Sequence, residues 1–321
     1  MRYINELREG DIVSDIYLCK VKQTAQTKAG KNYYSLLLQD KTGVLDGKVW
    51  DLSSRGIENF EAMDYIFVYG RVVSFQGTNQ LNIERIRKAQ DGEYVASDYL
   101  KCTKKDIKQM YDDILEMIKR TKDIYLKQLL ERFFVEDVIF KNAFQTHSAA
   151  KTVHHGYVGG LLEHTRAVAT LCEFYCTQYP VLNRDLLVTA ALFHDIGKLH
   201  EISPLPENDY TDEGQLVGHI VIGTLKIQEK IQTIPSFPVR LQRELLHCIL
   251  AHHGEYEFGS PKKPALIEAL ALTYADNTDA KMQTFLEELE RGKDKTERGE
   301  WLGYNRFFES NVRATSKPNI K

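Results

Sequence analysis

The sequence lacks the features of secreted, membrane-spanning and disulfide-stabilised proteins. Residues 1–10 contain no apolar segment of the kind that directs secretion, and no run of about 18 apolar residues occurs along the chain. The five cysteines form no Cys-X-X-Cys pair, and their odd number argues against a disulfide framework. We therefore expect a soluble protein of a reducing compartment, the cytoplasm, without membrane association.

Strong net charge, internal repeats and low-complexity segments are also missing. The 321 residues carry a net charge of −3, with 43% hydrophobic and 27% charged residues, which is ordinary for a globular protein. This balance excludes a uniformly basic nucleic-acid binder but permits a local basic groove. A chain of this length is long enough for two domains.

Residues 11–90 show the alternation of apolar and polar residues that is typical of β-strands. The polar segment 51–63 is predicted to hold one helix, between the third and fourth strands. This order predicts a five-stranded OB barrel, a fold whose open face binds single-stranded nucleic acid. The predicted strands cover residues 11–21, 33–38, 44–50, 65–75 and 80–87.

Basic and aromatic side chains on these strands are candidates for nucleic-acid binding. Cationic groups would contact phosphates, and aromatic rings would stack on bases. The alternative is that the aromatic residues fill the barrel core and the lysines cover a solvated face. For any one aromatic residue we favour the core, so this prediction depends on the barrel as a whole. The candidates are Lys20, Lys22, Tyr33, Tyr34, Lys48, Trp50, Arg71 and Phe75.

After residue 90 the apolar residues recur at spacings of three and four, which predicts helices. We expect the barrel at residues 1–90, a linker at 91–100, an all-α domain at 101–300 and a polar C-terminal tail at 301–321. The last helix is expected to pack internally, with a homo-oligomer contact as the alternative. Predicted helices cover 101–120, 122–134, 135–147, 160–178, 184–196, 217–232, 239–253 and 264–290, with surface loops at 205–214 and 260–264.

The helical half carries histidines and aspartates in the order H…HD…H…HH…D. Imidazoles and carboxylates suit divalent cations such as Mn²⁺, Fe²⁺, Zn²⁺ or Mg²⁺, and an aspartate carboxylate can bridge two ions. Each residue alone could be a core histidine or a helix cap, so the ordered set carries the signal. Its members are His164, His194, Asp195, His219, His252, His253 and Asp276.

Two glycines and a lysine accompany this set. Gly197 is expected to end one helix in the left-handed conformation, and Gly254 to end another after the histidine pair. Lys198 would then lie beside the metals and could contact a phosphate oxygen. An interaction with the helix dipole is an equal alternative for this lysine.

The ordered set resembles that of the HD phosphohydrolase superfamily, an all-α metal-dependent fold, over residues 110–290. The resemblance implies that His164, His194, Asp195 and Asp276 bind one metal. It further implies that His219, His252 and His253 are the additional ligands of the subgroups that hold two metals. In those subgroups the aspartate that matches Asp195 bridges the ions.

A barrel followed by an HD domain resembles the YhaM family of bacterial 3′→5′ exoribonucleases. The resemblance implies a metal-dependent 3′→5′ exonuclease acting on single-stranded RNA or ssDNA, which is held by the barrel. Hydroxide activated by two metals would attack the phosphodiester, with Asp195 and Lys198 as catalytic residues. We expect two divalent ions, Mn²⁺ first, with Fe²⁺, Mg²⁺ or Co²⁺ as alternatives. The matching segments are 33–36, 47–51, 159–165 and 251–254.

Two other functions stay open, namely an HD-type nucleotide phosphohydrolase and a non-enzymatic single-strand binding protein. The barrel would have little to do in the first, and a scaffold would have no reason to keep buried charged ligands. Cyclic-dinucleotide phosphodiesterases usually carry Gly-Tyr-Pro after the histidine pair, which segment 255–261 lacks. Whether Asp279 lies behind the ligands, and whether His154 and His155 line the active site, also stays open.

Overall fold

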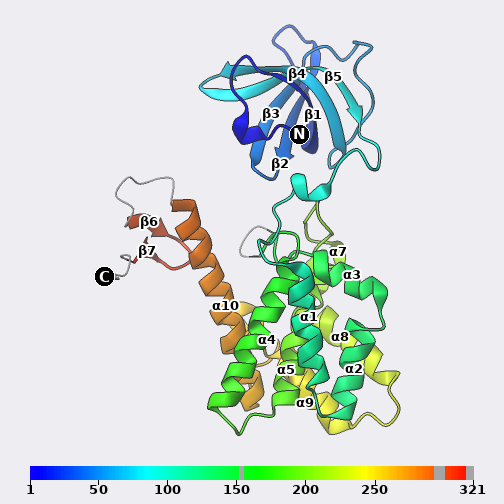
Figure 1. Cartoon of the computed structure of the whole chain (residues 1–321), viewed down its shortest axis with the longest axis vertical. Helices are drawn as coiled ribbons and strands as arrows, with labels where there is room; N and C mark the ends of the chain where they lie inside the picture. The colour runs from blue at the N-terminus through cyan, green and yellow to red at the C-terminus, as the bar shows by residue number, and fades with distance from the viewer. Residues whose placement is uncertain (152–154, 293–300, 316–321) are drawn as a thin grey trace. The chain divides into compact units, whose positions relative to one another are not determined.

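The chain forms two compact units in a computed structural model that describes residues 1–151, 155–292 and 301–315. The first unit comprises Met1–Cys102 with Leu205–Glu207, and the second comprises Thr103–Pro204 with Asn208–Lys321. The first is built on a β-barrel, and the second is helical with a small C-terminal hairpin (Figure 1). None of the helices in the described ranges has the length and hydropathy that a bilayer-spanning segment requires.

The first unit is a closed five-stranded barrel with the strand order β1-β2-β3-β5-β4. Strands β3 and β5 pair in parallel, whereas the other neighbouring strands pair antiparallel. This is an OB barrel, and the fold prediction is confirmed. The strands are β1 (Ile12–Gln26), β2 (Asn32–Asp40), β3 (Gly43–Val49), β4 (Tyr65–Phe75) and β5 (Thr78–Lys88).

The barrel core follows from the two-residue period of its strands. Leu36 and Leu38 of β2 and Val49 of β3 are almost fully buried, whereas their neighbours Leu37 and Lys48 are only half-buried. Burial of such side chains contributes about 1.5–3 kcal/mol each. One slip of register would exchange the two faces, so this alternation fixes how the strands pair.

The helix predicted within residues 51–63 is absent, and the segment pairs with β5 instead. The amide of Ile86 donates to Gly56 O at 2.8 Å, and the amide of Glu58 donates to Ile86 O at 2.9 Å. At the start of the segment, the Asp51 carboxylate accepts a hydrogen bond from the Ser53 hydroxyl at 2.7 Å. Backbone groups that bond to a strand and to such a local turn are not available for a helix.

The eight helices predicted for the second unit are confirmed, and several of them begin at a side-chain cap. Two short helices, Lys198–Glu201 and Asp212–Val217, were not predicted, and the second overlaps the loop expected at 205–214. Helix α1 begins after Asp106, whose side chain accepts from the amide of Gln109, and Asp123 and Asp137 cap the next two helices in the same way. The helices are α1 (Ile107–Lys119), α2 (Ile124–Phe134), α3 (Val138–Thr146), α4 (Gly160–Gln178), α5 (Arg184–Phe193), α6 (Lys198–Glu201), α7 (Asp212–Val217), α8 (His219–Gln232), α9 (Val239–Leu250) and α10 (Ile267–Gly292).

Helix α4 lies against α1, α5 and α10, and α9 lies against α5, α8 and α10 (Figure 1). The apolar faces of these helices form one continuous core. Cys172 of α4 is fully buried in it and Cys176 packs against it. This packing brings the start of α4, the end of α5 and the middle of α10 together.

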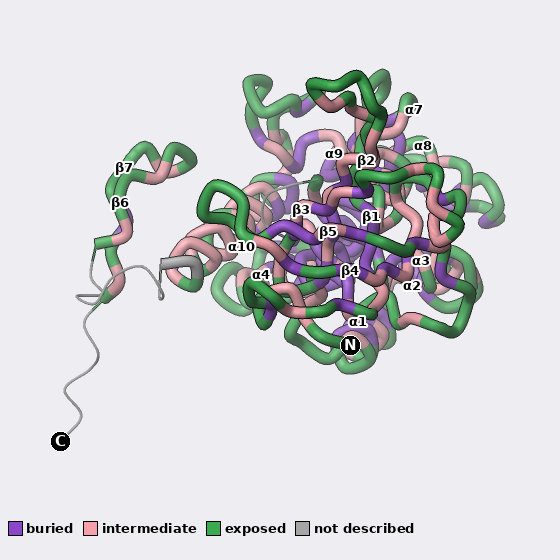
Figure 2. The backbone as a smooth tube through the Cα atoms, turned by 90° about the horizontal axis from the view of Figure 1, so that it is seen from above, coloured by how far each residue is buried: buried purple, intermediate pink, exposed green. Residues whose placement is uncertain are grey.

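Two segments, the expected linker at 91–100 and the expected tail at 301–321, contain structure that the sequence analysis did not predict. Tyr99 lies in the expected linker, but its ring is buried and contacts the Tyr65 ring of β4 at 5.1 Å. The segment expected to be a tail contains a hairpin of β6 (Trp301–Asn305) and β7 (Ser310–Arg313), most of which is exposed (Figure 2). Residues 316–321, the rest of the expected tail, lie outside the described residues.

Candidate metal centre

Three segments of the helical unit bring four of the predicted ligands together. His164 lies in the second turn of α4, His194 and Asp195 follow α5, and Asp276 lies on α10. The distance from His164 Nε2 is 3.1 Å to His194 Nε2, 3.2 Å to Asp276 Oδ1 and 3.4 Å to Asp195 Oδ2. These four ligand atoms can therefore surround one cation, and we call them the first ligand group.

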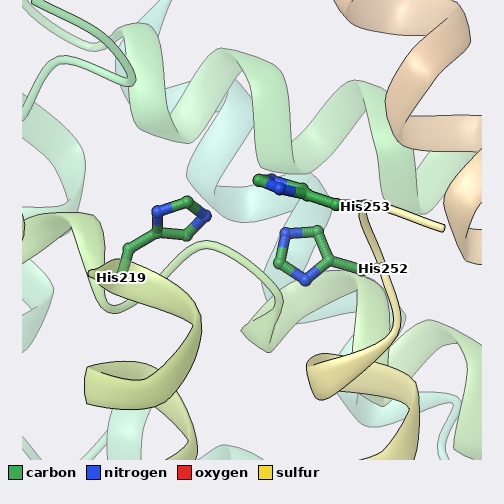
Figure 3. A group of neighbouring side chains, drawn as sticks. All are labelled: His219, His252 and His253. Carbon is green, nitrogen blue, oxygen red and sulfur yellow. The ribbon is translucent and has the colours of Figure 1, made fainter. Parts of the chain in front are cut away.

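A second ligand group consists of His219, His252 and His253. His219 is the first residue of α8, and the histidine pair lies in the turn that follows α9. Figure 3 shows the three rings turned toward a common space. One ring nitrogen from each residue lies within 4.8 Å of the other two. Two successive histidines can both face this space because they lie beyond the helix end, where the regular rotation of side chains stops.

Asp195 connects the two groups through its two carboxylate oxygens. Its Oδ2 lies 3.3 Å from His194 Nε2 in the first group. Its Oδ1 lies 3.5 Å from His219 Nε2 and 3.9 Å from His252 Nε2 in the second group. The carboxylate is 2% exposed and presents one oxygen to each side, which is the geometry that a bridging aspartate needs.

The five histidines of the two groups all use Nδ1 for a bond within the protein and direct Nε2 to the centre. A carbonyl or carboxylate oxygen can only accept, so Nδ1 is protonated in each ring and Nε2 is the nitrogen left to bind a cation. A hydrogen bond of this kind orients a metal-binding histidine. The pairs are His164 with Asp279 at 2.7 Å, His194 with Ala191 O at 2.8 Å, His219 with Glu201 at 2.9 Å, His252 with Ile249 O at 2.6 Å and His253 with Phe258 O at 2.8 Å.

Several of these inward-facing atoms are buried without a hydrogen-bond partner among the described residues. They are Asp195 Oδ1, His219 Nε2 and His252 Nε2. A buried polar atom without a partner costs about 1–3 kcal/mol, and a cation would satisfy all three at once. The residues therefore fit divalent cations, and the site has the ligand chemistry of a metal-dependent enzyme.

The charge states of the centre follow from burial and from close partners. Burial alone raises the pKa of Asp195, but Lys198 and the neighbouring histidines outweigh this effect and hold the pKa well below its ordinary value. Burial favours neutral His164, but the carboxylates around its ring raise the pKa well above the usual value. Burial and the adjacent histidines lower the pKa of His252. His252 is therefore neutral, which is the form that binds a metal.

Lys198 lies at the centre, as predicted, but it is paired with a ligand. Its Nζ lies 2.6 Å from Asp195 Oδ2, and this carboxylate raises the pKa of Lys198 despite the burial that opposes its charge. Lys198 is the first residue of α6 and follows Asp195 by three residues, across a turn closed by the hydrogen bond from the Lys198 amide to Asp195 O at 3.0 Å. It places a positive charge directly beside the first ligand group.

Further residues lie directly behind the ligands. The Asp279 carboxylate accepts from His164 Nδ1 at 2.7 Å and from His155 Nε2 at 3.0 Å. Asp279 therefore lies directly behind a candidate ligand, and His155 lies behind Asp279. His154 lies outside the described residues. Glu201, which orients His219, was missed, because only the fold brings the end of α6 to the start of α8. The only feature of the sequence that could have indicated Glu201 is its position one helical turn after Lys198.

The sequence predicted that Gly197 ends a helix in the left-handed conformation, and this prediction is wrong. Gly254, in contrast, has a φ of +80°, as expected. Gly197 is right-handed, with φ −62° and ψ −21°. An added Cβ would overlap the backbone carbonyl of His219 and lie 2.8 Å from the Gly223 backbone nitrogen. Glycine is therefore needed because α6 and α8 approach closely.

Substitution of this glycine tests the close approach. We expect Gly197→Ala to lower the free energy of unfolding by about 3 kcal/mol, because backbone atoms cannot move aside cheaply. Urea denaturation followed by circular dichroism measures the change. Gly43→Ala is the matched control, since its nearest neighbour would be a side-chain atom of Ile4 at 3.9 Å. Equal stability of the two variants would contradict this explanation.

On the barrel, four of the predicted nucleic-acid-binding residues gather on one outer face. Lys48 pairs in register with Asn82 of β5, and Arg71 of β4 pairs with Asn82 from the other side. Trp50 donates from Nε1 to Asn82 Oδ1 at 3.0 Å, and its ring lies 4.6 Å from that of Tyr33. Asn82, missed in the sequence, is thus the centre of this face, which we call the aromatic–basic face.

The other four candidates lie elsewhere on the barrel. Tyr34 packs against the barrel core, which is the alternative that the sequence analysis favoured for a single aromatic residue. Lys22 donates to Phe60 O at 2.5 Å and is therefore engaged within the unit. Lys20 is exposed on β1, and Phe75, at the end of β4, is 56% exposed.

Comparison with known proteins places the chain in a family. A family model of the HD domain matches residues 161–281. The 3′-5′ exoribonuclease YhaM of Bacillus velezensis is 33% identical over 314 residues, covering 97% of this chain and 96% of the relative. The YhaM of Bacillus subtilis is 35% identical over 315 residues, with coverages of 97% and 96%. Among solved structures, the second OB-fold domain of replication protein A from Methanococcus maripaludis has 20% identity and a TM-score of 0.23, covering 28% of this chain and 96% of that one. Because the likeness to the Bacillus proteins extends over nearly the whole chain, the protein belongs to the YhaM family of 3′-5′ exoribonucleases.

Proposed function

We propose that this protein is a metal-dependent 3′→5′ exonuclease that hydrolyses the phosphodiester bonds of single-stranded RNA. The observation that carries the proposal is Asp195, whose two oxygens face two separate ligand groups, as a centre with two cations requires. The Bacillus relatives, which are 3′-5′ exoribonucleases by name, supply the substrate class and the direction. The OB barrel supports a single-stranded substrate.

Each of the two ligand groups is proposed to hold one metal ion. His164, His194 and Asp276 would hold one ion, His219, His252 and His253 the other, and Asp195 would contact both. Bound divalent cations supply Lewis-acid chemistry, which neutralises phosphate charge and lowers the pKa of water. Lys198, whose Nζ is 2.6 Å from Asp195, would add positive charge against the phosphate oxygens in the transition state. The Nδ1 hydrogen bonds hold the imidazoles in the ligating orientation before substrate arrives.

The preferred metal follows from the donor set. Five imidazoles and two carboxylates offer more nitrogen than Mg²⁺ prefers, since Mg²⁺ favours oxygen ligands and retains water. Imidazole with carboxylate suits Mn²⁺ or Fe²⁺. We therefore infer Mn²⁺ as the activating ion, with Fe²⁺ next.

A gel time course with 5′-labelled single-stranded RNA tests the proposed function. In the presence of Mn²⁺ we expect a ladder that shortens from the 3′ end, and competition with ssDNA of the same sequence then measures the preference between the two. Intact but gel-shifted RNA would identify a binding protein and overturn the proposal. Intact, unshifted RNA together with hydrolysis of nucleotides would identify a nucleotide phosphohydrolase.

We propose that the aromatic–basic face holds the single-stranded RNA, and substitution of Trp50 tests this proposal. Trp50 is 43% exposed, so a base can stack on its ring. We expect Trp50→Ala to weaken single-stranded RNA binding by roughly 5- to 100-fold, with little dependence on sequence, because every base has a face for stacking. Fluorescence anisotropy measures the affinity. Val44→Ala, at a 53% exposed position of β3, is the control, and equal affinity of the two variants would remove Trp50 from the binding face.

A further inference from the structure

The cavity at the metal centre is lined by two phenylalanine rings that have no part in metal binding. It has a volume of about 580 Å³ and is lined by His164, Asp195 and His252 together with Phe258 and Phe307. Phe258 is 61% exposed and Phe307 is 50% exposed. Phenylalanine is usually buried, so two exposed rings beside a polar centre indicate a ligand with an apolar, planar part.

Phe258 is fixed relative to the metal ligands by its own backbone. It ends a short 3-10 helix at Tyr256–Phe258, and its carbonyl oxygen accepts the hydrogen bond from His253 Nδ1 at 2.8 Å. Phe258 therefore orients the His253 ring through its main-chain carbonyl, while its own ring lines the cavity. Truncation of the ring leaves the hydrogen bond to His253 in place.

Phe307 reaches the cavity from the turn of the C-terminal hairpin. The Asn305 side chain accepts from the amides of Phe307 at 2.8 Å and Phe308 at 3.2 Å, which fixes the turn. The Phe308 ring contacts the Phe285 ring of α10 at 5.2 Å. The turn is thereby held on the same helix that carries Asp276.

The cavity is also lined by a lysine side chain that could contact a phosphate. Lys281 of α10 lines it, is exposed, and makes no ion pair within the part of the chain that the structure describes. The centre thus combines cation sites and a lysine for phosphate with aromatic faces for a base. Its volume lies in the range of about 300–1,000 Å³ typical of small-molecule sites, which a nucleotide can occupy.

We propose that Phe258 and Phe307 form a stacking subsite for the nucleobase of the 3′-terminal nucleotide. This inference rests on the proposed exonuclease function, which it deepens by assigning the base to the two rings. Stacking uses the face of a base and not its hydrogen-bonding edge, so the subsite accepts all bases. Such tolerance suits an enzyme that removes successive nucleotides of any sequence.

Calorimetry with the full-length protein in Mn²⁺ tests the subsite without relying on turnover. The probes are AMP and ribose 5-phosphate, which differ only by the base. The wild-type protein is expected to bind AMP roughly 5- to 100-fold more tightly. In the Phe258→Ala/Phe307→Ala double variant the two affinities should agree within about twofold, since stacking is lost, while ribose 5-phosphate binds as before. Phe307→Trp keeps an aromatic face and should keep the preference.

The control is Phe174→Ala, because Phe174 is 57% exposed on α4 and lies outside the cavity. If the double variant melts early, Phe258→Leu/Phe307→Leu retains apolar volume without an aromatic face and replaces it. Preference for AMP that survives in the folded variant, or a wild-type protein that binds both probes equally, overturns the subsite.

The proposed function is tested separately with labelled RNA. RNA shortening together with an unchanged AMP preference in the double variant would reject the subsite and leave the exonuclease standing. Loss of the preference in a protein that does not shorten RNA would support the base subsite and reject the exonuclease.

Discussion

Replacement of Asp195 by Asn is expected to reduce RNA hydrolysis by on the order of 10³-fold or more. The amide keeps the size of the carboxylate but loses the negative charge and offers only one oxygen, so it cannot serve both ligand groups. Asp195 is 2% exposed, and no water shell replaces the lost interaction. Lys198 would also lose the partner that lies 2.6 Å away. The initial rate of RNA shortening with saturating Mn²⁺ measures the effect.

A folded but inactive variant is the informative outcome. Asp112→Asn is the matched control, because Asp112 is exposed on α1 of the same unit and the same chemical change there should leave the rate within about twofold. Circular dichroism confirms that both variants fold. Hydrolysis by folded Asp195→Asn at the wild-type rate would show that this carboxylate does not hold the ions.

Removal of divalent cations is expected to abolish hydrolysis and to lower the melting temperature of the helical unit. A ligand present at 100 times its dissociation constant stabilises the folded state by about 2.7 kcal/mol. For a unit of this size that corresponds to roughly 5–10 °C. The unpartnered Asp195 Oδ1 and His219 Nε2 are the atoms that gain partners when cations bind. Differential scanning calorimetry with EDTA and then with excess Mn²⁺ measures the shift, and added Mn²⁺ should restore activity.

The Asp195→Asn variant is also the control for this experiment. Its melting temperature should respond to Mn²⁺ much less than that of the wild-type protein, because both ligand groups lose their shared member. A full shift in this variant would mean that Mn²⁺ binds elsewhere. Activity of the wild-type protein that persists in EDTA would rule out dependence on exchangeable metal.

The parts of the fold set by local periodicity were predictable from sequence. The barrel strands have a period of two, and the capped helices have a period near 3.6, so their ranges and types agree with the structure. The candidate ligands could be picked out from the sequence because they belong to a few chemically distinctive residue types, and the structure brings all of them to one centre.

Features that depend on pairing between distant segments were not predictable in this way. The segment 51–63 is polar enough for a surface helix, but its amides bond to β5. Gly197 looked like a helix end, but its lack of a side chain serves the contact with α8. Asp279 and Glu201 orient ligands from other helices, and only a tertiary structure shows which carboxylate faces which imidazole.

The hydrogen-bond acceptor of each histidine Nδ1 is either a main-chain carbonyl or a side-chain carboxylate, and only the second kind can be removed by a substitution. His194, His252 and His253 donate to main-chain carbonyl oxygens, which no point substitution can delete. His164 and His219 instead donate to the side chains of Asp279 and Glu201. Each ligand group therefore has one replaceable anchor, and a shorter, longer or uncharged residue there changes ligand basicity on one side alone. An attempt to engineer the metal preference of this centre therefore has two positions outside the candidate ligands, Asp279 and Glu201.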